Sequence, residues 1–252
     1  MIDTLILEVA GRCQRSCGRC YVPLGRFDTP GWMTFEAWRR VITDAAGLAV
    51  RRLLLVGGEP TSNPALPDLI DHSLAASMEV QLWTNLVKVS SRLWEAFSQP
   101  GVQIATSISG DPATHHPASD RAGARAQTLT NLRVAVNRGI TLHVGLVCLA
   151  MGDDDLARRL PPGLSVSRID RDPACGVGHG VDHSRGMSGG RGTCGLRRAA
   201  VLADGRVTPC VTARGDTSGN VRDTALGQLL AGQRWSNVVA AARTKASSGG
   251  CV

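Results

Sequence analysis

Apolar runs of strand length alternate with amphipathic stretches along the first two-thirds of the chain. The apolar runs predict strands at residues 5–9, 52–56, 79–83, 102–108, 141–149 and 164–169. Between them, apolar residues recur at helical spacing and predict helices at residues 34–46, 66–76, 91–97, 127–138 and 154–160. Thr34, the first residue of the first helical pattern, is expected to be its N-cap.

This order of elements indicates the fold class. Strands that alternate with helices predict a parallel sheet, because crossover helices join parallel neighbours. The strands are apolar without alternation, which fits burial on both faces. Six such units are fewer than the eight of a closed barrel. We therefore expect an α/β fold, with an open, partial (β/α)6 barrel over residues 1–171.

The pattern changes after residue 171. Residues 172–193 are rich in Gly, Ser, Asp and His and show little periodicity. Two apolar runs, 198–202 and 207–211, then flank Asp204-Gly205, which predicts a β-hairpin. Short helices are expected at 224–232 and 236–244. We expect a second, smaller hairpin-and-helix domain over residues 172–252.

Composition narrows the classes of function. The chain has 252 residues and a formal charge of +7, and no apolar run approaches the roughly 20 residues that span a bilayer. We find no signal peptide and expect a cytoplasmic protein with no membrane partner. The arginines are scattered and not gathered in a stripe, which argues against a nucleic-acid partner. A featureless basic surface or an acidic peptide partner fits as well.

Eight cysteines without a secretory signal indicate metal or redox chemistry more than a disulfide framework. Cys13, Cys17 and Cys20 directly follow the first predicted strand, at the end where α/β barrels carry their active sites. Three thiolates bind three irons of a cubane cluster and leave the fourth open, whereas ferredoxin-type sites use four cysteines. A structural zinc site completed by a distant ligand, or a set of buried thiols, is the alternative.

The C-x3-C-x2-C spacing resembles the signature of the radical S-adenosylmethionine (SAM) superfamily. In that family the amino and carboxylate groups of SAM chelate the open iron, and one-electron cleavage yields a 5′-deoxyadenosyl radical. The resemblance implies a 4Fe-4S cluster on the three cysteines, SAM as cofactor, and a reductant such as flavodoxin or ferredoxin. Arg19 stands where the family often has an aromatic residue. Tyr21 follows instead and is a candidate cofactor contact.

The sequence Gly57-Gly58-Glu59-Pro60 follows the second predicted strand and matches the family's GGEP motif, which binds the SAM amino group. Glycines at this place let the backbone approach a ligand closely. An ordinary turn before a helix is the alternative. Weaker similarities at the ends of later strands add further candidate cofactor contacts, which polar loops or helix caps would also explain. These are Thr84, Asn85, Ser107, Ser109 and Arg121.

The region from Cys194 to Arg222 resembles the twitch half of a SPASM-type extension, which holds an auxiliary iron–sulfur cluster. Cys194 and Cys210 stand where two ligands are expected, and Cys175 and Cys251 are further candidates. Alternatively, Cys251 is the first of a run that this chain lacks. A zinc-bound or simply reduced hairpin is another alternative.

Superfamily members with such extensions most often act on ribosomally made peptides, and form thioethers, carbon–carbon crosslinks or epimers. The resemblance therefore implies a peptide substrate. Radical dehydrogenation, decarboxylation or rearrangement of a small natural-product intermediate is the alternative. The first predicted barrel strand begins at Leu5, with no leader-binding winged helix before it. If the substrate has a leader, a separate protein is therefore expected to recognise it. A non-catalytic iron–sulfur or zinc protein is a third class, against which the GGEP motif argues. No residue is assigned as catalytic.

Overall fold

The computed structural model describes residues 1–15, 20, 33–109, 123–148, 168–173 and 197–247. Five helices or helical turns follow the strands of its first part. The strands are β1 (Thr4–Ala10), β2 (Arg52–Gly57), β3 (Glu79–Trp83), β4 (Val102–Ser109), β5 (Thr141–Cys148) and β6 (Arg168–Pro173). The helices are α1 (Phe35–Gly47), the 3-10 turn η1 (Pro60–Ser62), α2 (Leu66–Ala75), α3 (Ser91–Phe97) and α4 (Ala124–Asn137).

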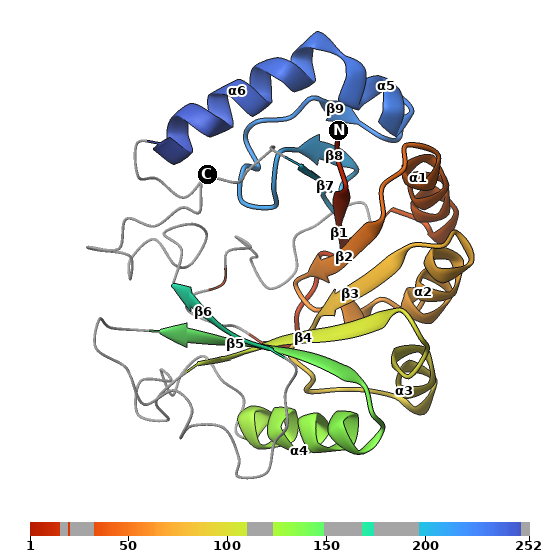
Figure 1. Ribbon diagram of the computed structural model, residues 1–252, viewed down its shortest axis with the longest axis vertical. Helices are drawn as coiled ribbons and strands as arrows, with labels where there is room; N and C mark the ends of the chain where they lie inside the picture. The colour runs from red at the N-terminus through yellow and green to blue at the C-terminus, as the bar shows by residue number, and fades with distance from the viewer. Residues whose placement is uncertain (16–19, 21–32, 110–122, 149–167, 174–196, 248–252) are drawn as a thin grey trace.

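The strands form one curved sheet. Over the described residues its order is β6-β5-β4-β3-β2-β1-β7-β8-β9, and β1 to β6 are parallel neighbours in sequence order. Figure 1 shows α1 to α4 along one side of this sheet. The α/β class and the parallel sheet are confirmed.

β1 is buried along its whole length, whereas β2 to β5 also carry half-buried or exposed positions, so the expected burial of both faces holds fully for β1. Leu5, Leu7 and Val9 of β1 belong to the main core that the helices cover, with Trp38 and Ile42 of α1. The opposite, concave face carries a second apolar cluster. It contains Ile6, Val56 and Ala200, with Leu54, Trp83 and Val211 packed against them. Site residues on the concave face therefore lie on a sheet whose opposite face packs against the helices.

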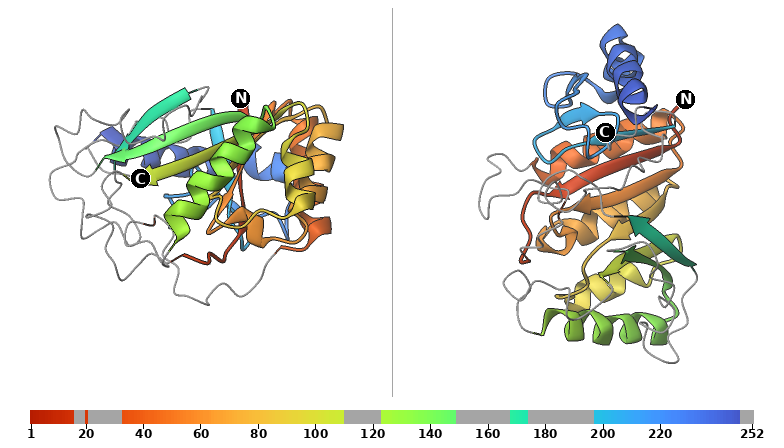
Figure 2. Two further views of the ribbon diagram at one scale, coloured as in Figure 1. Left: turned by 90° about the horizontal axis from the view of Figure 1, so that it is seen from below. Right: turned by 90° about the vertical axis from the view of Figure 1, so that its left-hand side faces the viewer.

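The C-terminal elements continue the same sheet. They are β7 (Arg198–Val201), β8 (Arg206–Thr208), β9 (Gly219–Asn220), α5 (Leu226–Ala231) and α6 (Gln233–Ser247). β7 pairs in parallel with β1, and β8 returns antiparallel to it, so the predicted hairpin is confirmed. Gly205 in its turn has φ +88°, a conformation that favours glycine. Figures 1 and 2 show these elements beyond the β1 edge of the barrel strands.

Local signals set several boundaries. Thr34 caps α1 as predicted, because its Oγ1 accepts a hydrogen bond from the Ala37 amide at 3.2 Å. The last barrel strand is described from Arg168, later than the predicted start at 164, and the predicted helix at 154–160 lies outside the described residues. No helix in the described part of the chain has the length and apolar character needed to cross a membrane.

Candidate cofactor site

The loop after β1 is held against the glycine motif by two close backbone contacts. The Gly58 amide donates to the Ala10 carbonyl and the Glu59 amide to the Arg12 carbonyl, each at 2.7 Å. A Cβ atom on Gly58 would lie 2.4 Å from the Arg12 oxygen, and one on Gly57 would lie 2.3 Å from the Ala10 oxygen. The two glycines are therefore required where the chain segments meet, one residue before Cys13.

The carboxylate of Glu59 is the centre of the site. It is 1% exposed and accepts four hydrogen bonds, all from neutral donors. Oε1 accepts from the Thr61 amide and hydroxyl and from Thr84 Oγ1, at 3.1, 2.8 and 2.5 Å. Oε2 accepts from the Asn85 amide at 2.7 Å.

Burial raises the pKa of Glu59, and the hydrogen bonds from Thr84, Asn85 and Thr61 oppose that rise. Neutral donors orient the carboxylate without cancelling its charge. A buried anion of this kind attracts a cationic ligand group, such as an ammonium. The residues present thus fit the SAM amino group that the motif resemblance implies.

The turn after β3 connects Glu59 to the first cysteine. Asn85 Oδ1 accepts from Gln14 Nε2 and from the Val87 amide, each at 3.0 Å, and its Nδ2 lies 3.7 Å from Cys13 Sγ. Leu86 has φ +54°, which is rare for a branched residue outside turns. The structure thus brings Cys13, Glu59 and Asn85 into one hydrogen-bonded group.

The other predicted cofactor contacts fall into three groups. Cys20 is described and half-buried, as is Cys13, and Pro60 is buried at the start of η1. Ser107 lies on β4 beside Gly145, and none of the hydrogen bonds above reaches it. Four further candidates have no described side chain. Cys17, Tyr21 and Arg121 lie outside the described residues, and Ser109 lies within β4 without a described side chain.

The concave face near this site carries a pair of rings. Trp83 and His143 are both in register with Ala105 of the strand between them, and their ring centroids are 5.4 Å apart. The small Ala105 leaves room for the two rings to meet across β4. At the next position of β5, a Cβ on Gly145 would lie 3.3 Å from Ser107 Oγ. Small residues therefore keep space above this part of the sheet.

A buried ion pair fastens the loop after β8 to the barrel. Glu8 of β1 is 2% exposed, and its carboxylate accepts from both terminal nitrogens of Arg214 and, at 3.1 Å, from the Ala203 amide. Burial raises the pKa of Glu8, and Arg214 opposes the rise. The same loop carries Cys210, whose Sγ lies 3.0 Å from Thr212 Oγ1. Cys175, Cys194 and Cys251 lie outside the described residues.

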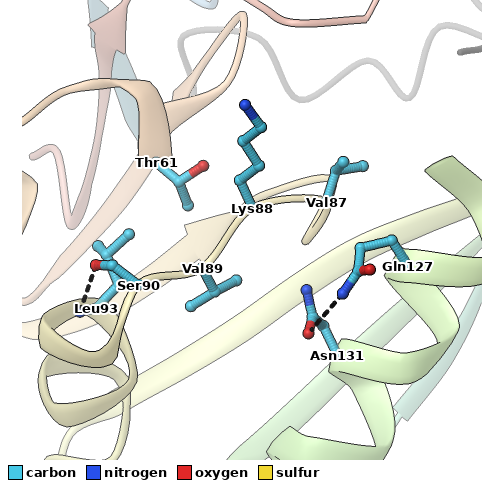
Figure 3. A pocket seen from close by; sticks show the side chains of 8 residues that line it. All are labelled: Thr61, Val87, Lys88, Val89, Ser90, Leu93, Gln127 and Asn131. Atoms are coloured by element: carbon cyan, nitrogen blue, oxygen red, sulfur yellow. Dashed lines mark hydrogen bonds between the residues drawn. The ribbon is translucent and has the colours of Figure 1, made fainter.

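A separate pocket of about 390 Å³ lies between η1, the loop after β3 and α4. Figure 3 shows Lys88 and Thr61 at its border and a hydrogen bond from Gln127 to Asn131 on α4. Asn131 also donates to the Leu86 carbonyl at 2.6 Å. Neither Cys13 nor Trp83 lines the pocket, so it is distinct from the thiol site and the concave face.

Several residues of the site carried no signal in the sequence. Gln14, Thr61 and Thr128 hydrogen-bond to Asn85 or Glu59, and Asn131 hydrogen-bonds to the neighbouring Leu86, but each is a common polar residue in a loop or helix. Glu8 is the exception, because a charged residue inside an apolar strand indicates a buried charge that needs a partner.

Several solved structures share the fold of this chain, among them proteins bound to a precursor peptide or to AdoMet. SuiB of Streptococcus suis bound to precursor peptide SuiA superposes with a TM-score of 0.77 at 12% identity, over 95% of this chain and 67% of that one. His-tagged anSMEcpe with bound AdoMet gives 0.75 at 13% identity, over 95% and 80%. BtrN in complex with AdoMet and 2-DOIA gives 0.61 at 14% identity, over 99% and 88%. At these identities the likeness concerns the fold.

Curated relatives share more sequence. The PqqA peptide cyclase of Streptomyces rochei is 31% identical over 160 residues, which are 62% of this chain and 43% of that protein. The enzyme of the same name from Ruegeria pomeroyi is 28% identical over 181 residues, 70% of this chain and 48% of that one. The chain thus spans less than half of the length of these relatives.

The family model of the radical SAM superfamily matches residues 7–158. That range contains the three cysteines of the first cluster, the glycine motif and the Thr84-Asn85 turn, and it covers more than half of the chain. The chain therefore belongs to the radical SAM superfamily, whose cofactors are a 4Fe-4S cluster and SAM.

Proposed function

We propose that the chain modifies a ribosomally made peptide by radical SAM chemistry, forming a thioether, a carbon–carbon crosslink or an epimer. The observation that carries the proposal is the group formed by Cys13, Asn85 and Glu59 at the ends of β1 to β3, in a chain similar to peptide cyclases. In that group the backbone amide of Asn85 donates to the buried carboxylate, and its side-chain amide faces the thiol.

A 4Fe-4S cluster and SAM bound here would supply the radical chemistry that abstracts a hydrogen atom from the substrate. Cys13, Cys17 and Cys20 are proposed to hold the cluster. Glu59 is proposed to accept the SAM amino group, since its buried charge meets only neutral donors. Further proposed SAM contacts are Tyr21, Gly57, Gly58, Pro60, Thr84, Asn85, Ser107, Ser109 and Arg121.

We propose that the peptide lies over the concave face beside this group. The indole nitrogen of Trp83 is buried and has no hydrogen-bond partner among the described residues. A buried N–H without a partner is costly, and a peptide carbonyl that displaced the atoms covering the indole would satisfy it. The apolar surface around it, with Ile6 and Val56, would keep water from the reacting carbon.

Residues 172–252 are proposed to form the second domain, with an auxiliary iron–sulfur cluster on Cys175, Cys194, Cys210 and Cys251. In support, Glu8 and Arg214 fix the Cys210 loop on the first barrel strand. Thiolate clusters need a reducing compartment, so we infer a cytoplasmic enzyme. Flavodoxin or ferredoxin is the inferred reductant, and a separate protein is inferred to bind any leader.

A small natural-product intermediate is the second candidate substrate. The similarity in fold to BtrN, which was solved with AdoMet and 2-DOIA, supports this candidate. Both substrates would use the same cofactor site, so the chemistry at Glu59 does not separate them.

The test is incubation of the anaerobically reconstituted chain with SAM, dithionite and the peptide encoded by a short reading frame beside its gene. Mass spectrometry should show loss of two hydrogen atoms for a crosslink, or deuterium gain in heavy water for an epimer. SAM cleavage with an unchanged peptide, and conversion of a co-encoded small-molecule intermediate, would favour the second candidate.

A further inference from the structure

The side chain of Asn85 faces the thiol of Cys13 in a fixed orientation. Its Oδ1 accepts from the Val87 amide at 3.0 Å. A backbone N–H is a donor only, so its partner must be the amide oxygen and not the nitrogen. The Asn85 Nδ2 is therefore the atom turned toward Cys13 Sγ, at 3.7 Å.

The backbone of this turn is held from three sides. The Asn85 amide donates to Glu59 Oε2 at 2.7 Å, and Thr128 Oγ1 donates to the Asn85 carbonyl at 2.7 Å. Asn131 Nδ2 donates to the carbonyl of Leu86, the residue with φ +54°, at 2.6 Å. Asn85 thus points at the sulfur without needing to be ordered by a ligand.

We propose that Asn85 tunes the reduction potential of the cluster that Cys13 binds, through an N–H···S hydrogen bond. The proposal rests on Cys13 being a cluster ligand and needs no particular substrate. One electron from an external reductant adds negative charge to the cluster, and part of it falls on the thiolate sulfurs. A donor to that sulfur stabilises the reduced form more than the oxidised form, and so raises the potential.

The contact is compatible with metal binding. In the thiol form, Cys13 Sγ lies 3.9 Å from Gln14 Oε1, where it is the donor. A coordinating thiolate has lost its proton, so that interaction ends. The donors from Asn85 Nδ2 and from the Arg15 amide, at 3.4 Å, remain. Of these two donors, only Asn85 can be removed by a side-chain substitution.

The test compares full-length wild type, Asn85→Asp, Asn85→Ala and Asn137→Asp after anaerobic reconstitution. Asn85→Asp keeps an oxygen for Val87 and Gln14 but loses the donor, and Asn137→Asp makes the same chemical change at an exposed end of α4. Iron is counted, and the midpoint potential is measured by mediated dithionite titration with EPR detection. The signal that changes when SAM is added identifies the cluster with the open iron.

In both Asn85 variants the one-electron reduction equilibrium should become less favourable by about tenfold, which is about 59 mV. The shift should be larger in Asn85→Asp, because a carboxylate adds negative charge near the sulfur. Iron content should match wild type, and Asn137→Asp should leave the potential unchanged.

Full iron content with an unchanged potential in both Asn85 variants would overturn the proposal. Loss of iron from both would also overturn it, since Asn85 would then serve only to build the site. A Cys13→Ser variant tests the premise separately. If it retained all iron and an unaltered EPR signal, Cys13 would not be a ligand. Because the titration contains no peptide, these outcomes are independent of the proposed substrate.

Discussion

The Glu8–Arg214 ion pair gives a prediction whose size can be worked from the structure. In Arg214→Met the Glu8 carboxylate, 2% exposed, loses its cation and keeps the Ala203 amide as a donor. Removing one partner of a buried pair costs about 3–5 kcal/mol. The Arg214 side chain is 22% exposed, which places the expected loss of unfolding free energy near the lower end, about 3 kcal/mol.

The double variant Glu8→Met/Arg214→Met should be more stable than Arg214→Met alone. It removes both charges, and well-packed apolar replacements of a buried pair are often neutral or stabilising. It also leaves the Ala203 amide without its acceptor, at a cost of about 1–3 kcal/mol. Anaerobic urea unfolding of the four proteins, including Glu8→Met, gives the coupling energy of the cycle. Additive effects would refute the reasoning.

The pH dependence of the stability loss in Arg214→Met tests the same ion pair independently. Burial raises the pKa of Glu8 above its ordinary value, and Arg214 lowers it, so the pKa should rise further in Arg214→Met. The native state then holds an extra proton over a wider range, and stability falls as pH rises through that range. The cost of Arg214→Met should therefore grow as the pH rises above the ordinary pKa of a glutamate. A cost that shrinks with rising pH would contradict the assignment.

Three further substitutions test the site and its supports. Gly58→Ala should lower both the free energy of unfolding and the iron content, because its Cβ would meet the Arg12 carbonyl. The control Gly47→Ala has open space around its Cβ and should be neutral or slightly stabilising. Unfolding curves and iron analysis of the two variants test this. Glu59→Gln should weaken SAM binding by about tenfold or more with iron content unchanged, as equilibrium dialysis would show, because it removes the buried charge. Equal SAM affinity in the variant would exclude Glu59 as the ammonium site. Thr34→Ala should cost about 1 kcal/mol in urea unfolding, since α1 loses its cap, and no measurable cost would contradict the cap.

Much of the fold was predictable from local signals. The apolar runs located β1 to β5, because the strands of a parallel sheet covered by helices carry mostly apolar residues. The Asp204-Gly205 turn located the hairpin, because its backbone conformation favours glycine. The pairing of β7 with β1 was not predictable, since it joins Thr4 to Arg198, more than three-quarters of the chain apart.

The site was predictable to the level of its motifs. The spacing of the cysteines and the resemblance of Gly57–Pro60 to the family's motif predicted Cys13 and Glu59 as site residues, and the structure brings the two together through Asn85. The partners that hold them, such as Thr128 and Arg214, are not predictable from spacing, because each contact depends on how distant elements pack. The role of the glycines also needed the structure, which shows them pressed against Ala10 and Arg12. The assignments of Cys175, Cys194 and Cys251 remain predictions.

The central claim is that Cys13, Cys17 and Cys20 hold a cluster that cleaves SAM beside Glu59. The most direct measurement is the formation of 5′-deoxyadenosine from SAM by the reconstituted, dithionite-reduced chain, compared with its Cys13→Ala, Cys17→Ala, Cys20→Ala triple variant and an Asn137→Asp control. The account predicts 5′-deoxyadenosine from wild type and the control, and none from the triple variant. Cleavage retained by the triple variant, or absent from an iron-loaded wild type, would contradict it.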